Sequence, residues 1–132
     1  FHIYIQLDKR IEGEQVSVGW LLLSYFTLGK HAIVVDTDID IFNERQVLWA
    51  VASRVQADRQ IHIGSEMMAV GNIDPSCVYN TRGSKMVIDA TRPLDKSFHE
   101  VIDVPREALE MFPLHKYLSR EDIDKSPHLS NA

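Results

Sequence analysis

The sequence has little of several features that direct a chain to particular classes of protein. It holds one cysteine, Cys77, so an internal disulfide cannot form, and this favours a reducing compartment. Its 14 basic residues are outnumbered by 19 acidic ones, and the net charge of −5 disfavours a nucleic-acid partner. No apolar run approaches the roughly 20 residues needed to cross a bilayer, and no secretory signal pattern is visible. We therefore predict a cytoplasmic protein without an integral membrane segment.

What is present suits one folded domain. Of the 132 residues, 45% are hydrophobic and 25% are charged, which is normal for a globular protein. A chain of this size buries roughly two-thirds of the surface that it exposes when unfolded, so it needs neither a disulfide nor a structural metal. We expect a single domain over residues 1–125, followed by a frayed tail over residues 126–132.

Strands and a helix are predicted in the first third of the chain. Residues 1–7 alternate apolar and polar side chains, which indicates a half-buried strand. Residues 14–28 are apolar enough for a buried helix, with Gly29 as its C-cap. The β-branched run at 32–35 is typical of a strand that is covered on both faces, as in a parallel sheet.

A second helix is predicted after Asn43. Asn43 and Gln46 have the spacing of a capping box, and valines recur every fourth position on one face of the helix that follows, at positions 47, 51 and 55. The remaining expected elements are strands at 61–63 and 85–90, an ordered loop at 65–79, and short helices at 105–111 and 115–118. The alternation of strands and helices predicts a layered α/β domain with right-handed crossovers.

An acidic run follows the strand at 32–35 and allows three interpretations. Calcium binding by an EF-hand loop is excluded, because Ile41 and Val47 stand where that loop needs Gly and Glu. A haloacid-dehalogenase-like phosphatase would use Asp36 as nucleophile and Asp38 as acid/base, although Asp40 stands where Thr or Val is usual. The third interpretation is structural: the acids end the strand and favour the positive N-terminus of the next helix.

Other reactive residues give no chemical signature. The six histidines lack the i, i+4 spacing of a metal site. Cys77 has no visible base nearby, so we predict an inert thiol. No glycine-rich phosphate loop is present. From these patterns alone, the chain is an α/β domain with an acidic strand end and a structured loop.

Three ordered stretches carry a family resemblance. The first runs from Lys30 to Arg59 and contains the acidic run, the second is Gly71-Asn72-Ile73-Asp74-Pro75-Ser76, and the third is Lys85-Met86-Val87-Ile88-Asp89-Ala90-Thr91. In this order and spacing they closely resemble the C-terminal domain of UbiD-type (3-polyprenyl-4-hydroxybenzoate decarboxylase-like) carboxy-lyases. The resemblance covers residues 1 to about 94 and implies a layered α/β/α domain with a mixed, mainly parallel sheet.

The resemblance implies a function for a larger enzyme. Members are non-oxidative, reversible decarboxylases of aromatic or α,β-unsaturated acids. They use prenylated FMN, manganese or another divalent ion, and potassium. These groups and the Glu-Arg-Glu catalytic residues belong to regions outside this chain. We therefore expect no catalytic, cofactor-binding or metal-binding residue here, and we expect the chain alone to be inactive. The stretch 102–105 with 117–118 is reminiscent of members that act on hydroxybenzoates.

The resemblance also implies a site and partners. Ile73 occupies the family's Leu position, whose side chain packs over substrate and flavin, and Gly71 and Asn72 flank it at the rim of the substrate pocket. The acids of the run at 36–40 become structural. The expected partners are the rest of the same enzyme, a second copy through this domain, and an aromatic acid substrate. The alternatives are a free-standing phosphatase that uses Asp36 and Asp38, and a pure interaction module.

Overall fold

A computed structural model describes residues 1–77, 81–98, 105–113, 116–119 and 121. They fall into two units, residues 1–98 and 99–132, which are described separately. The tail expected at 126–132 lies outside the described residues, as does part of the turn of helix expected at 115–118. The expectation of one domain over 1–125 stays a prediction.

The first unit is built on a four-stranded sheet in the order β1-β2-β4-β3. Its strands are β1 (His2–Gln6), β2 (His31–Val35), β3 (Ile61–Met68) and β4 (Arg82–Ala90). The strands β1, β2 and β4 are parallel to one another, whereas β3 pairs with β4 in the antiparallel direction. The sheet is therefore mixed and mainly parallel, as predicted.

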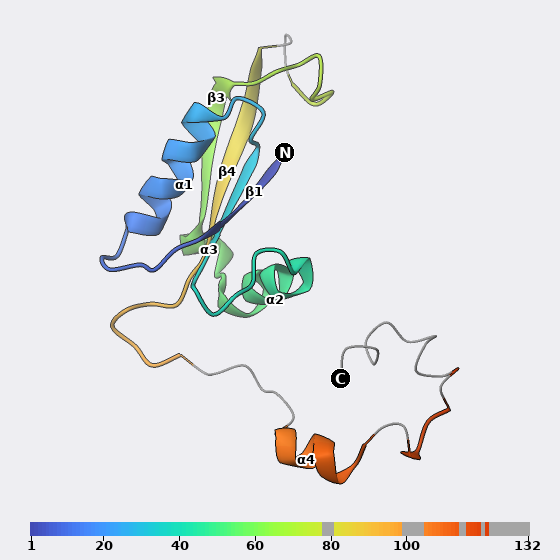
Figure 1. Cartoon of the computed structure of the whole chain (residues 1–132). Coiled ribbons are helices and arrows are strands. Elements are labelled where there is room, and N and C mark those ends of the chain that lie inside the picture. Colours follow the sequence, from blue (N-terminus) through green and yellow to red (C-terminus); the bar gives the residue numbers. More distant parts are fainter. Residues whose placement is uncertain (78–80, 99–104, 114–115, 120, 122–132) are drawn as a thin grey trace. The chain divides into compact units, whose positions relative to one another are not determined.

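Helices cover both faces of this sheet (Figure 1). Helix α1 (Glu14–Tyr25) joins β1 to β2, and α2 (Glu44–Arg54) with the single turn α3 (Ala57–Gln60) joins β2 to β3. Successive residues of β2 point to opposite faces, so each face has its own apolar cluster. The cluster under α1 contains Leu23, Ala32, Val34 and Val87. The cluster under α2 contains Ile33, Val35, Ile39, Val47, Ala50, Ile88 and Ala90. This arrangement confirms the predicted α/β/α layering.

One glycine fixes how closely α1 approaches the sheet. A Cβ atom built on Gly19 would lie 2.6 Å from Cγ1 of Val87, which is fully buried on β4. Only a residue without a side chain allows this approach. The close contact sets the separation between α1 and the middle of the sheet.

Helix α1 is shorter than predicted. It ends at Tyr25 with Phe26 as C-cap, so the expectation of a helix to residue 28 capped by Gly29 is wrong. The buried side chain of Lys85 donates from Nζ to the carbonyl oxygen of Leu23 (2.7 Å), with longer contacts to those of Phe26 and Thr27 (3.3 and 3.4 Å). The Leu23 carbonyl is one of the groups that a helix end leaves without an intrahelical partner. A side chain 60 residues away in the sequence thus contributes to ending the helix.

Two local predictions differ from the structure in the middle of the chain. Strand β3 continues to Met68, so the loop expected from residue 65 is wrong over 65–68. Glu66 has a φ of 58°, and the register shifts between Gly64 and Met67, which together make a bulge that interrupts the strand pattern. Helix α2 begins after Asn43 as predicted, but the reciprocal capping box is absent. Asn43 Oδ1 accepts from the Arg45 amide, whereas Gln46 Oε1 accepts from the Asp40 amide.

The second unit contains one described helix, α4 (Arg106–Met111), with Pro105 as its N-cap. This confirms the helix predicted at 105–111. The stretch 102–104, which carried the hydroxybenzoate hint, lies outside the described residues. No helix among the residues that the structure describes is long and apolar enough to cross a membrane.

Candidate functional site

The turn after β3 brings the three predicted site residues together. The amides of Ile73 and Asp74 both donate to the carbonyl oxygen of Val70, at 3.0 and 2.9 Å, and fold residues 70–74 into a tight turn. Gly71 is half-buried and Asn72 is exposed. The side chain of Ile73 is 52% exposed, which leaves a large apolar group in contact with solvent on an ordered turn. We call residues 70–76 the substrate turn, after the role that the family resemblance implies for Ile73.

The substrate turn is tied to the sheet by one lysine. Lys30 Nζ lies 2.8 Å from Asp74 Oδ2 and donates to Ser76 Oγ at 2.5 Å. The amide and the hydroxyl of Ser76 donate to the other carboxylate oxygen of Asp74, at 3.0 and 2.7 Å. The Lys30 ammonium, followed by these Ser76 donors, holds the pKa of Asp74 well below its usual range. Asp74 is therefore a carboxylate at neutral pH.

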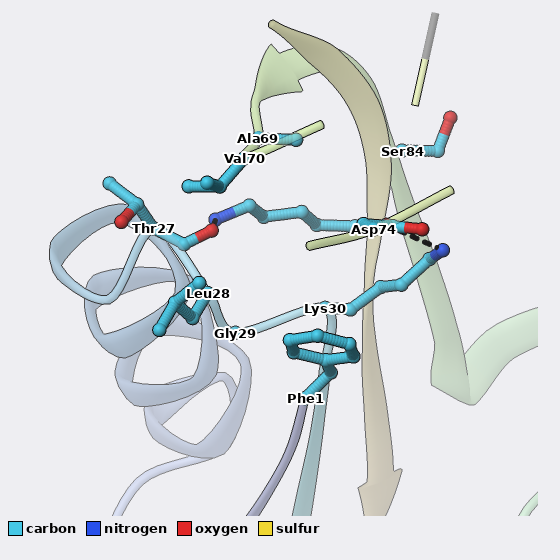
Figure 2. A pocket seen from close by; sticks show the side chains of 10 residues that line it. Phe1, Thr27, Leu28, Gly29, Lys30, Ala69, Val70, Asp74 and Ser84 are labelled. Carbon is cyan, nitrogen blue, oxygen red and sulfur yellow. Dashed lines mark hydrogen bonds and ion pairs between the residues drawn. The ribbon is translucent and has the colours of Figure 1, made fainter. Parts of the chain in front are cut away.

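A small pocket lies between the substrate turn and the end of α1 (Figure 2). It is lined by Phe1, Thr27, Leu28, Gly29, Lys30, Ala69, Val70, Asp74, Ser84 and Lys85. Its cavity volume is about 10 Å³, which is room for roughly one water molecule. A flavin does not fit there.

The described residues do not fit a metal either. Within the part of the chain that the structure describes, no group of three or more His, Cys, Asp or Glu side chains could hold a metal ion. A site for the manganese that the family implies is therefore not formed by the described residues, and we derive no step through manganese or flavin from this chain.

Cys77 lies at the end of the substrate turn and is not activated. Burial raises the pKa of its thiol, and a hydrogen bond to the Asp74 carboxylate raises it further. Because the thiolate is the nucleophilic form, a raised pKa lowers the reactivity. This geometry agrees with the predicted inert thiol.

The acidic run lies at the opposite end of the sheet, where β2 and β4 end. Asp36 Oδ2 accepts from Arg54 NH1 and from the Arg92 amide, each at 2.8 Å. Asp38 is 2.8 Å from Arg54 NH2, and this hydrogen bond lowers the pKa of the Asp38 carboxyl. Asp40 accepts from the amide of Phe42 in the turn before α2. Asp36 and Asp38 thus tie the end of β2 to the last residue of α2, and Asp36 also ties it to the segment after β4.

This arrangement does not support the phosphatase alternative. The Asp36 carboxylate, the proposed nucleophile, is paired with Arg54, whose side chain is only 1% exposed. The chemistry also needs a divalent ion, and the described residues supply no cluster to hold one. The structural interpretation of Asp36 and Asp38 is the one that the contacts favour.

Sequence reasoning missed a second buried network at the same end. Lys9 Nζ donates to Glu12 Oε2, Thr91 Oγ1 and the carbonyl oxygen of Arg92, at 3.0, 3.0 and 2.7 Å. Asp89 accepts from Gln15 Nε2 at 2.7 Å. Lys9 stands in a charged, turn-like stretch, so no local signal indicates that its side chain is buried. Only the third motif, which contains Asp89 and Thr91, marked this region.

Sequence reasoning also treated the histidines as scattered, yet the parallel pairing of β1 and β2 brings two of them together. His2 and His31 are register partners, and their ring centroids lie 4.9 Å apart. Burial lowers the pKa of His31, and the neighbouring positive charges lower it further. A neutral His31 is the form that this environment favours.

The layered sheet and the motif of the substrate turn define a carboxy-lyase domain. Residues 1–90 match the model of the 3-octaprenyl-4-hydroxybenzoate carboxy-lyase C-terminal domain, and the chain belongs to this UbiD family. In sequence it is 38% identical over 96 residues to the anhydromevalonate phosphate decarboxylase of Methanocaldococcus jannaschii, covering 72% of this chain and 23% of that protein. The enzyme of the same name from Aeropyrum pernix is 35% identical over 94 residues, covering 71% and 21%.

Solved structures agree with this assignment. The UbiD-class enzyme HmfF from Pelotomaculum thermopropionicum, in complex with FMN, superposes with a TM-score of 0.74 at 34% identity, over 89% of this chain and 26% of that one. An evolved dimeric form of HmfF with prFMN gives 0.64 at 32% identity, over 89% and 23%. Vanillic acid decarboxylase from Sedimentibacter hydroxybenzoicus in closed form gives 0.71 at 29% identity, over 87% and 26%. The chain spans about a fifth to a quarter of the curated relatives' length.

Proposed function

We propose that this chain is the substrate-covering and dimerisation domain of a prenylated-FMN-dependent, non-oxidative and reversible decarboxylase. The relatives are decarboxylases, and HmfF has been solved with FMN and with prFMN. The proposed substrate is an aromatic acid, of the hydroxybenzoate type, or an α,β-unsaturated acid. Vanillic acid decarboxylase supports the aromatic class, while the anhydromevalonate phosphate decarboxylases are more similar in sequence, so the proposal keeps both classes.

The observation that carries the proposal is the exposed side chain of Ile73 on an anchored turn. A branched apolar group that is 52% exposed loses contact with water when it covers a substrate. Excluding water strengthens the electrostatic interactions inside an active site, and a fixed cover holds the substrate against the reacting group. In this proposal Gly71 and Asn72 form the rim of the pocket, where the Asn72 amide can bond to a polar group of the substrate.

The proposal divides the work between this chain and the rest of the same enzyme. Prenylated FMN, the divalent ion and potassium are assigned to the remaining regions, together with the acid-base residues. The opening and closing of the site would come from movement of this domain, and the Sedimentibacter enzyme is known in both a closed and an open form. The isolated chain is then expected to bind no flavin and to decarboxylate nothing; turnover by the chain alone contradicts this division. A cytoplasmic location is part of the same proposal.

The outer face of α1 supports the dimerisation role. Residues 15–29 include no charged side chain, although the helix has one face in solvent. Leu21 is 68% exposed and Tyr25 is 78% exposed, one helical turn apart. An uncharged face of this kind is typical of a protein interface, and we assign it to a second copy. Leu21→Glu should shift the mass of the complete enzyme, measured by light scattering, towards that of a single copy; an unchanged mass contradicts the assignment.

The central test changes Ile73 in the complete enzyme. Ile73→Asp places a charge over the substrate and should lower the decarboxylation rate on the order of 100-fold, with the flavin content unchanged. Ile73→Leu, which introduces the family's residue, should keep the rate within a few-fold. Ile11→Asp is the matched control, because Ile11 is 73% exposed and lies away from the substrate turn. An unchanged rate in Ile73→Asp, or an equal loss of rate and flavin, contradicts the proposal.

A further inference from the structure

One side chain holds two positions of the substrate turn at once. Lys30 Nζ is within hydrogen-bonding distance of Asp74 Oδ2 and of Ser76 Oγ, the residues on either side of Pro75. We propose that Lys30 is a positioning residue of the decarboxylase: it latches the substrate turn to the sheet and so fixes where Ile73 lies. This inference rests on the proposed function, and we call the contacts of Lys30 with Asp74 and Ser76 the Lys30 latch.

The base of the latch is rigid. The amide of Lys30 donates to the carbonyl oxygen of Phe1 at 2.8 Å, and its own carbonyl oxygen accepts from the amide of Met86 at 2.9 Å. Lys30 is therefore bonded through its backbone to the start of β1 and to β4, just before β2 begins. Its side chain reaches the turn from a backbone that cannot shift without breaking the parallel sheet.

The other end of the latch is close to Ile73 along the chain and is fully bonded. One oxygen of Asp74 pairs with Lys30, and the other accepts from the Ser76 amide and hydroxyl. The Ser76 hydroxyl thus donates to Asp74 while it accepts from Lys30, which closes a ring of three groups. The amides of Asp74 and Ile73 share Val70 as acceptor, so a displacement of Asp74 displaces Ile73 with it.

The turn needs such a tie because the strand pairing stops before it. The β3–β4 ladder ends at the pair of Met68 and Arg82, and one further backbone bond runs from the Ala69 amide to the Thr81 carbonyl oxygen. The residues from Val70 to Ser76 lie beyond that bond. A charge pair from Lys30, just before β2, to Asp74, 44 positions along the chain, is the kind of contact that restrains a loop tip which the ladder does not reach.

Stability alone does not account for this arrangement. The side chains of Lys30 and Asp74 are 29% and 17% exposed, and partly exposed pairs add little to folding. A positioning role and a merely structural role therefore differ in their kinetic effect. Loss of the latch should leave the fold and the flavin content intact while it lowers the rate of the chemical step.

The first experiment measures steady-state kinetics of the complete, flavin-loaded enzyme. Lys30→Met should lower kcat about tenfold, with flavin content and thermal midpoint unchanged. Lys30→Arg, which keeps the charge and the reach, should recover most of the rate. Lys96→Met is the matched control, because Lys96 is an exposed lysine at the other end of the sheet. It should leave kcat, flavin content and thermal midpoint unchanged. A fall in flavin content that matches the fall in rate, or no rescue by arginine, overturns the proposal.

The second experiment asks whether Lys30 acts through Ile73. In an Ile73→Ala background the side chain to be positioned is gone, so Lys30→Met should lower kcat less than twofold further. A further tenfold loss of kcat in the Ile73→Ala background overturns the proposed role of the Lys30 latch. The two proposals fail differently: an unchanged rate in Ile73→Asp contradicts the substrate-covering function itself. A slow Ile73→Asp enzyme together with a fully active Lys30→Met enzyme contradicts only the latch.

Discussion

The two ends of the sheet hold their charges in opposite ways. At the carboxyl end of β2 and β4, Lys9 and Arg54 have side chains that are 2% and 1% exposed, and their partners surround them. At the amino end, Lys30 and Asp74 are both partly in solvent. Buried charges at one end serve the stability of the fold, whereas the partly exposed pair at the other end adds little to stability. The end with the weaker contribution to stability is the one that carries Ile73.

The carboxyl end is also where parallel α/β sheets usually bind ligands. Here the protein's own side chains use that position. Lys9 Nζ donates hydrogen bonds to Glu12, Thr91 and the Arg92 carbonyl oxygen. Arg54 donates to Asp36 and Asp38. The pockets that remain at this end are lined by the same paired groups. Because β3 is antiparallel to β4, the loop that joins them lies at the amino end of the parallel strands. This loop carries the proposed substrate-covering residue.

The largest expected effect breaks the buried end. Arg54→Met removes the buried cation that Asp36 and Asp38 share and leaves them the longer contacts of Arg92, at 3.3 and 3.8 Å, so it should lower the free energy of unfolding by about 2–3 kcal/mol in urea titrations. Arg59→Met is the matched control, since the Arg59 side chain is 73% exposed and pairs with the exposed Asp58 at 3.5 Å, and it should cost under about 0.5 kcal/mol. Similar values for the two variants would remove the contrast between the ends.

Acid should weaken the same end through Asp38. The Arg54 hydrogen bond lowers the pKa of Asp38 in the folded protein, so this stabilisation is present above the unfolded pKa of about 3.9. It is lost as the pH falls through the lower, folded value. Urea titrations between about pH 5 and about pH 2 should show a steeper loss of stability in the natural protein than in Asp38→Asn. Equal slopes would mean that this pair contributes nothing.

A smaller effect is expected at the exposed end. Lys30→Met should change the free energy of unfolding by less than about 1 kcal/mol, because the pair that it breaks is partly solvated. Its effect on the rate should nevertheless exceed that of most surface substitutions. The free energy of unfolding and kcat should be measured on the same preparation of Lys30→Met. A loss of several kcal/mol in the free energy of unfolding would mean that the amino end contributes as much to stability as the carboxyl end.

The smallest effect concerns Cys77, the chain's single cysteine. Burial and the bond to Asp74 raise the pKa of its thiol, so alkylation by iodoacetamide near pH 8 should be several-fold slower in the native protein than in denaturant. A native rate equal to the denatured rate would show that the turn gives the thiol no protection.

The elements that periodicity defines were predicted well. The β-branched run of β2 and the valine repeat of α2 each have one structural interpretation, and both elements lie where expected. The errors arise where tertiary contacts decide. Lys85 helps to end α1 early, and the left-handed Glu66 hides the second half of β3. Neither effect leaves a local signal, because the first depends on a residue far along the chain and the second breaks the alternation.

The candidate site was only partly predictable. Ile73 was found through the family motif, since an isoleucine in a loop has no chemical signature of its own. The latch was not found, because Lys30 and Asp74 are 44 positions apart and each reads as an ordinary surface charge. The acidic run shows the converse: Asp36 and Asp38 look reactive in sequence, yet Arg54 pairs with both.

The antiparallel direction of β3 has a consequence for engineering. It makes the segment between Met68 and Arg82 a hairpin tip whose two ends leave the sheet side by side. Such a tip can be exchanged between relatives as a single cassette, because the ion pairs of Lys9 and Arg54 lie at the opposite end of the sheet. A donor tip should be accepted when it brings an aspartate and a serine for Lys30 to hold. Variants of the proposed substrate cover can therefore be confined to one short stretch of the gene.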